Sequence, residues 1–176
     1  MTQFARPDAD VSDGDWLNQD DSNSNLYASI DEASHSDSDY IKAEDPGYGT
    51  PTDMPVTIGL SDINEPDGNA DHKIKYRATE NSGSNAVQLT VQLLEGSTSR
   101  KSVTNSSIGG SFAEYTINLS EAEANNISDY TNLKLKFTAS DTQGGGAVTK
   151  ISWAEFQAPD AAASTTTSPA FLMFVH

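Results

Sequence analysis

The chain has 176 residues, a formal net charge of −16 at pH 7 and no cysteine. This length suits one domain with extensions, and the charge disfavours contact with nucleic-acid backbones or anionic membrane surfaces. The lack of cysteine excludes disulfides and thiolate metal sites. The first residues, MTQFARPDAD, lack the basic and apolar regions of a signal peptide, so no export signal is predicted.

The N-terminal third of the chain holds most of the net charge. Residues 1–53 carry 13 acidic and 2 basic side chains (net −11), whereas residues 54–176 carry 13 acidic and 8 basic side chains (net −5). Apolar residues are too sparse in this third to form a separate core. We expect an opening strand near residues 4–11, a helix of one or two turns near residues 25–32 and a short strand near residues 39–43, all packed on the rest of the domain.

The middle of the chain alternates apolar and polar residues with a period of two, which is typical of strands with one buried face. Clusters of Gly, Asn and Asp separate these runs, and EGSTS at residues 95–99 predicts a tight hairpin. In the last run Ile151 and Trp153 fall on one face and Ala154 and Phe156 on the other, so we expect both faces to be covered. The alternating runs are 56–60, 74–78, 87–93, 115–119, 133–137 and 148–159.

One helix is predicted, in SEAEANNI at residues 120–127. Ser120 can accept a hydrogen bond from a free N–H group of the first turn while Glu123 reaches back, which forms a capping box. Several short strands and one short crossover helix indicate an all-β fold, an antiparallel β-sandwich of jelly-roll type. We expect this domain to span residues 1–157. Residues 158–170 then form a flexible linker, and residues 171–176 an extended apolar C-terminal arm.

No motif for catalysis is present, so we do not expect an enzyme. The acidic stretch DADVSDGDW places Asp8, Asp10, Asp13 and Asp15 at spacings that resemble a calcium loop. The EF-hand pattern fails, because Gly14 comes one position late and no glutamate closes the loop. A Ca²⁺ site and a solvated acidic loop are both open as interpretations, and the solvated loop is favoured. No other cofactor is expected.

Two tryptophans are candidates for stacking on a sugar ring. Trp153 falls on the same face of its strand as Ile151, which favours a place in the core. Trp16 follows a turn-like DGD sequence, so a place in the core is less clearly favoured and a sugar-binding role is more open. The histidines His35, His72 and His176 are far apart without metal-ligand spacing, so we interpret them as lone surface side chains.

Basic residues form two stripes on the outer faces of predicted strands, and like charges on adjacent strands need counter-charges. Nearby carboxylates are the default explanation for these stripes, and an acidic neighbouring subunit is the alternative. The stripes comprise Lys73, Lys75 and Arg77, and Lys134 and Lys136.

The C-terminal arm is apolar and β-prone. It follows a linker of 13 residues (158–170), which could span roughly 40 Å when extended. An arm of this kind can add as a strand to the sheet edge of another subunit, or it can fold back on its own sandwich. The residues predicted to bind a partner are Phe171, Leu172, Met173, Phe174 and Val175.

Several stretches between residues 4 and 159 resemble a family of small jelly-roll proteins encoded in tailed-phage genomes. They are ARPDADVSDGDW, NLYASIDEASHSDSDYI, KIKYRA, LTVQLLEG, SFAEYTINLSEAEANNISDYTNLKLKF and ISWAEFQAP. The resemblance implies a virion structural protein, such as a capsid decoration or cement protein or a tail-associated protein, and it brings no catalytic residues.

These observations lead to one expected function and one alternative. The expected function is that of a non-enzymatic phage virion protein that stabilises the particle through oligomerisation and its C-terminal arm. Its partners would be the major capsid protein and copies of itself. The alternative is a carbohydrate-binding module of a tail fibre or host-recognition protein, with Trp16, Tyr27 or Tyr48 stacking on the glycan and Ca²⁺ assisting.

Overall fold

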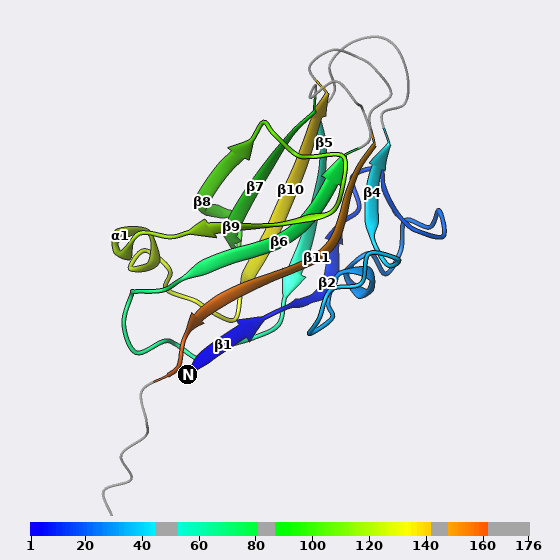
Figure 1. Cartoon of the computed structure of the whole chain (residues 1–176). Helices are drawn as coiled ribbons and strands as arrows, with labels where there is room; N and C mark the ends of the chain where they lie inside the picture. Colours follow the sequence, from blue (N-terminus) through cyan, green and yellow to red (C-terminus); the bar gives the residue numbers. More distant parts are fainter. Residues whose placement is uncertain (45–52, 81–86, 142–147, 162–176) are drawn as a thin grey trace, which may run out of the picture.

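The computed structural model describes residues 1–44, 53–80, 87–141 and 148–161. Figure 1 shows the strands arranged as two layers, with the short helix beside strands β8 and β9. In chain order the elements are β1 (Thr2–Ala5), β2 (Pro7–Ser12), β3 (Trp16–Asn18), the 3-10 turn η1 (Tyr27–Ser29), β4 (Ile41–Glu44), β5 (Asp53–Leu60), β6 (Lys73–Glu80), β7 (Val87–Glu95), β8 (Thr98–Asn105), β9 (Ala113–Asn118), α1 (Glu121–Ala124), β10 (Leu133–Asp141) and β11 (Val148–Pro159).

The strands form two antiparallel sheets. Sheet A has the order β3-β4-β11-β6-β9, with β1 paired to the C-terminal half of β11, and sheet B has the order β2-β5-β10-β7-β8. From β4 onward the chain changes sheet at every connection except the β7–β8 hairpin, which is the order of a jelly roll. The predicted all-β sandwich of jelly-roll type is therefore confirmed, and β11 continues to Pro159, beyond the predicted end of the domain at residue 157.

The N-terminal third supplies η1 and β4 near the expected positions, together with a strand, β3, that the sequence pattern missed. The prediction of a single opening strand near residues 4–11 is wrong, because the chain forms two strands there, β1 paired to β11 of sheet A and β2 paired to β5 of sheet B. Between β2 and β3 the backbone N–H of Trp16 donates to the carbonyl oxygen of Asp13 at 2.9 Å. Gly14 and Asp15, at the two central positions, have positive φ angles of 52° and 70°. Positive φ at both positions is characteristic of a type I′ turn. This turn carries the chain from sheet B to sheet A.

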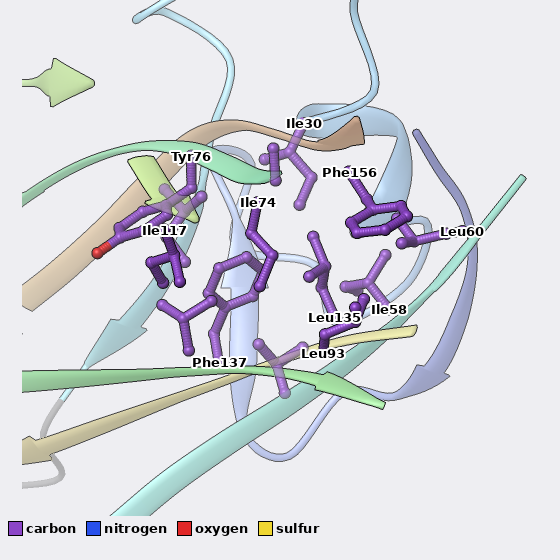
Figure 2. Packing of buried hydrophobic residues seen from close by; sticks show 14 of the residues in the cluster. Ile30, Ile58, Leu60, Ile74, Tyr76, Leu93, Ile117, Leu135, Phe137 and Phe156 are labelled. Atoms are coloured by element: carbon purple, nitrogen blue, oxygen red, sulfur yellow. The ribbon is translucent and has the colours of Figure 1, made fainter. Parts of the chain in front are cut away.

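The core lies between the two sheets. Figure 2 shows how inward side chains of both sheets point towards each other. Aromatic rings take part in the packing, because Phe137 of β10 meets Tyr76 of β6 edge to face with ring centroids 6.2 Å apart. The labelled residues in the view are Ile58, Leu60, Leu93, Leu135 and Phe137 of sheet B, Ile74, Tyr76, Ile117 and Phe156 of sheet A, and Ile30 after η1.

The prediction that both faces of β11 are covered is confirmed, since residues 151–156 are all buried, but the predicted assignment of its side chains to the two faces is wrong. A β-bulge between Ile151 and Trp153 inserts Ser152 into the strand. A bulge shifts the alternation of side chains by one position. As a result Ile151, Ala154 and Phe156 all belong to the core, whereas Trp153 lies outside the core cluster.

Helix α1 connects β9 of sheet A to β10 of sheet B, as predicted, and its capping box is present. The Ser120 hydroxyl accepts from the Glu123 backbone N–H at 3.3 Å, and Glu123 Oε2 accepts from the Ser120 backbone N–H at 2.8 Å. Lys101 of β8 donates to both carboxylate oxygens of Glu123 at 2.8 Å. These hydrogen bonds lower the pKa of Glu123 to about 2, and the hydrogen bond from Lys101 contributes most.

Replacing this carboxylate, Glu123→Gln, is expected to lower the free energy of unfolding at neutral pH and to have little effect near pH 2. The unfolded chain binds a proton at Glu123 near pH 4.5, whereas the folded chain does so only at about 2. Stability from this group is therefore present above pH 4.5 and is lost as the pH falls towards 2. Urea unfolding across this range measures the effect. The control Glu121→Gln, in the same helix, should change the stability by less than about 0.5 kcal/mol.

Candidate functional site

The segment between η1 and β4 covers part of the outer face of sheet A. The Trp153 side chain is 6% exposed. Its indole N–H donates to the Glu32 carbonyl oxygen at 2.8 Å, and its ring meets His35 edge to face. Asp37 accepts hydrogen bonds from Arg77 Nε and Nη2, both at 2.7 Å, and these hold the pKa of Asp37 below its usual value. The ring of Trp153 is thus occupied in fixing this segment.

The remaining aromatic candidates are also engaged in packing. Trp16 is 0% exposed and donates its indole N–H to the Met54 carbonyl oxygen at 2.9 Å. Its interpretation as an open sugar platform is therefore wrong, because the ring closes the sandwich between β3 and β5. Tyr27 is partly buried against the core, and Tyr48 lies outside the described residues.

Two half-buried rings at the margin of sheet A already carry cations on their faces. Tyr40 and Phe112 lie with ring centroids 6.3 Å apart. Lys150 Nζ lies 4.3 Å from the centroid of Tyr40, and the Arg77 guanidinium lies 5.9 Å from that of Phe112. Such cation–π contacts stabilise the local fold and leave these ring faces covered.

His72 is a core residue, so its interpretation as a surface histidine is wrong. Its Nδ1 lies 3.1 Å from the Ala70 carbonyl oxygen, and its Nε2 lies 2.9 Å from the Tyr130 hydroxyl. Burial lowers the pKa of His72, because a buried imidazolium loses its hydration. His35 is exposed beside Trp153, and His176 lies outside the described residues.

The four carboxylates proposed for Ca²⁺ have different roles. Asp10 accepts from the two backbone N–H groups at the start of η1, at 2.8 and 3.0 Å. Asp13 accepts from the Gly14 N–H at 2.8 Å, and Asp8 and Asp15 are exposed. Within residues 1–44, 53–80, 87–141 and 148–161, no group of three or more acidic or histidine side chains could hold a metal ion.

The basic stripe on β6 of sheet A has counter-charges. Lys73 Nζ lies 3.7 Å from Asp71, Lys75 Nζ lies 3.2 Å from Glu114, and Arg77 is paired with the loop that covers this face. The default prediction, a solvated stripe with nearby carboxylates, is therefore correct for this strand.

The stripe on β10 of sheet B differs. Lys134 and Lys136 face outward from the centre of the sheet and keep part of their surface in solvent. Within the described part of the chain, neither lysine has a carboxylate partner within ion-pair distance. The default prediction therefore fails here, and the two ammonium groups are available to a ligand.

Hydroxyl and amide side chains surround these lysines, and we call this surface the lysine face. In one row across four strands, Thr57 lies beside Lys136, which lies beside Gln92, which lies beside Ser102. The adjacent rows add two apolar side chains, Pro55 beside Thr138 and Leu94 beside Lys134, and further hydroxyls. The members of the lysine face are all half-buried or exposed; they are Pro55, Thr57, Thr90, Gln92, Leu94, Ser99, Ser102, Thr104, Lys134, Lys136 and Thr138.

The described segments contain no pocket. They also contain no helix that is long and apolar enough to cross a membrane. The candidate site is the lysine face, where the ammonium groups of Lys134 and Lys136 lie among hydroxyl and amide side chains.

Comparisons with known proteins give architectural similarity only. No family model and no curated protein matches the chain. One similar solved structure is TmCBM61 in complex with β-1,4-galactotriose (12% identity, TM-score 0.40, covering 90% of this chain and 88% of that chain). A second is a family 16 carbohydrate binding module-2 (9% identity, TM-score 0.35, covering 72% of this chain and 82% of that chain). A third is the CBM36-1 domain of a multidomain xylanase from the hindgut metagenome of Trinervitermes trinervoides (13% identity, TM-score 0.37, covering 93% of this chain and 100% of that chain). Similarity of this size does not transfer a ligand to this chain.

The predicted partner-binding arm, Phe171 to Val175, lies outside the described residues, as does most of the linker before it. The role in a phage particle, its capsid partners and its location in the virion therefore stay predictions.

Proposed function

We propose that the chain is a non-catalytic glycan-binding protein and that the lysine face is its contact surface. The observation that supports this is the chemistry of the face: most of its outward side chains are hydroxyl, amide and ammonium groups, and Pro55 and Leu94 are its apolar members. A polyhydroxylated ligand needs many donors and acceptors in fixed positions, and side chains on a sheet provide them with little loss of conformational freedom on binding.

Other classes of partner fit this face less well. The cores of protein interfaces are enriched in aromatic residues, methionine and arginine and depleted in lysine and serine, which is the opposite of the composition here. Nucleic-acid binding depends on many phosphate contacts from a basic surface, whereas the lysine face has two basic side chains, Lys134 and Lys136. Interfacial membrane binding needs an apolar face.

The geometry favours an extended ligand that crosses the strands. Neighbouring strands lie about 4.8 Å apart, and outward residues of one strand lie about 6.8 Å apart. A chain of sugars lying across β5, β10, β7 and β8 can therefore contact one side chain from each strand. A net contribution of about 1 kcal/mol for each hydrogen bond gives a modest affinity, which repeated sites along a polysaccharide would increase.

Removal of two hydrogen-bonding groups, Thr57→Ala and Gln92→Ala, tests this proposal. The full chain should bind at least one polysaccharide in a panel of neutral and acidic glycans, measured by calorimetry. The double variant should bind it at least about fivefold more weakly, because each lost hydrogen bond contributes about 1 kcal/mol. Thr116→Ala, an exposed threonine on sheet A, is the matched control and should leave the affinity unchanged. Binding to no glycan, or equal losses in both variants, would contradict the proposal.

A further inference from the structure

We propose that the ligand of the lysine face is an acidic polysaccharide whose anionic groups pair with Lys134 and Lys136. This inference rests on the proposed function and names the ligand class of the same site. Its basis is a difference between these two lysines and the other basic side chains of the molecule.

The chain has 26 acidic side chains for 10 basic ones, so a cation can readily find a carboxylate. Lys150 lies over an aromatic ring instead. Within the described residues, Lys134 and Lys136 have neither kind of partner. The basic residues that do form ion pairs are Arg6, Lys42, Lys73, Lys75, Arg77, Arg100 and Lys101.

Two carboxylates at the margin of the lysine face do not neutralise it. Asp53, on β5, accepts a hydrogen bond from Ser140 Oγ at 2.5 Å. Asp8, on β2, lies close to Gly59, which is the cross-strand neighbour of Lys134. Partial burial and the charge of the nearby Asp62 raise the pKa of Asp8. Neither Asp8 nor Asp53 forms an ion pair with a lysine of this face in the part of the chain that the structure describes.

Lys134 and Lys136 do not stabilise the fold through an ion pair among the described residues. Lys134 and Lys136 are two positions apart on one strand, so their outward side chains start about 6.8 Å from each other. Two like charges at this distance repel each other without a counter-charge. An anionic ligand would supply the missing counter-charge.

The neighbours of Lys136 fit a sugar acid. A carboxylate or sulfate placed at the ammonium group would accept a charge-assisted hydrogen bond, which is roughly twice as strong as a neutral one. Thr57 and Gln92 lie directly beside Lys136 on the two adjacent strands, within reach of the hydroxyls of the same sugar. Lys134 lies one row away on the same strand, so it can pair with an anionic group on the other side of a polysaccharide that crosses the strands between the two rows.

The test uses the full chain and two double variants that each remove two positive charges. Lys134→Gln with Lys136→Gln alters the lysine face, and Lys73→Gln with Lys75→Gln alters the ion-paired stripe of sheet A. Calorimetry with polygalacturonate, dextran sulfate, a neutral galactan and polyglutamate provides the readout at low and at high salt. The first two polymers distinguish carboxylate from sulfate as the anionic group, and polyglutamate reports adventitious attraction to any polyanion.

We expect at least one acidic polysaccharide to bind at least about tenfold more tightly than the neutral galactan, since a hydrogen bond to a charged group adds more than a neutral one. The lysine-face variant should lose at least that factor, the sheet A variant should keep full affinity, and high salt should weaken binding. A variant with Lys134→Arg and Lys136→Arg should restore binding. Thermal melting should show that every variant is folded.

Three results would overturn the inference. They are a neutral glycan bound as tightly as the acidic ones, equal losses in the two glutamine variants, and polyglutamate bound as tightly as the polysaccharides. The first leaves the proposed function intact if Thr57→Ala with Gln92→Ala still weakens binding. Absence of binding to every glycan would overturn the proposed function as well.

Discussion

Alanine at position 14 is expected to destabilise the fold by more than about 3 kcal/mol. Gly14 has a φ of +52°, and a Cβ atom built there would lie 1.6 Å from the carbonyl oxygen of Pro55. The obstacle is backbone, so either the turn or β5 has to move. Because this turn places Trp16 between the two sheets, its displacement would also open the edge of the core.

Two other glycines separate the causes of this loss. Gly109 has no Cβ clash and no positive φ, so Gly109→Ala should change the stability by less than about 0.5 kcal/mol. Gly96 has a φ of +59°, close to that of Gly14, and a Cβ atom built there would lie 3.4 Å from Asn132 Nδ2, an ordinary contact, so Gly96→Ala reports the cost of the backbone angle alone. Urea unfolding of the three variants provides the comparison. If Gly14→Ala were no less stable than Gly96→Ala, the close approach of the turn to β5 would be wrong.

The second large effect is expected for Phe137→Ala, with a loss of about 3–5 kcal/mol. Phe137 is 0% exposed on β10, at the centre of sheet B, and its ring packs against Tyr76 of the opposite sheet. Removal of the ring leaves a cavity between the sheets that the surrounding strands can fill only in part.

The adjacent residue provides the matched control for this variant. Thr138 faces outward on the same strand, so Thr138→Ala should change the free energy of unfolding by less than about 0.5 kcal/mol. Similar losses in Phe137→Ala and Thr138→Ala, measured by urea unfolding, would contradict the assignment of the two faces of β10. That assignment also places Lys134 and Lys136 on the outer face.

The sequence predicted the jelly roll because its central strands alternate clearly between apolar and polar residues. It missed β3, which has three residues, and it indicated β8 only through the hairpin predicted at residues 95–99, because Val103 is the one apolar residue in TSRKSVTN. An edge strand with little buried surface leaves no periodic signal. The bulge at Ser152 was also invisible, because periodicity assumes an unbroken alternation, and Trp153 was therefore assigned to the wrong face.

The candidate site could be predicted only in part. Both basic stripes were visible in the sequence, but the fold decides which of them is neutralised. The partners of the β6 stripe come from positions 37, 71 and 114, and only the tertiary structure shows that the lysines of β10 receive no such partner among the described residues. The sugar platform predicted at Trp16 failed for the same reason, since a single aromatic residue after a turn does not reveal which element will cover it.

The binding of an acidic glycan to the lysine face is tested most directly by a nuclear magnetic resonance titration of the isotope-labelled full chain with a soluble acidic oligosaccharide. We expect backbone amide shifts to change mainly in β5, β7, β8 and β10, with the largest changes around Lys134, Lys136 and Gln92. Shift changes confined to sheet A or to the loops, or no changes at any ligand concentration, would contradict this expectation.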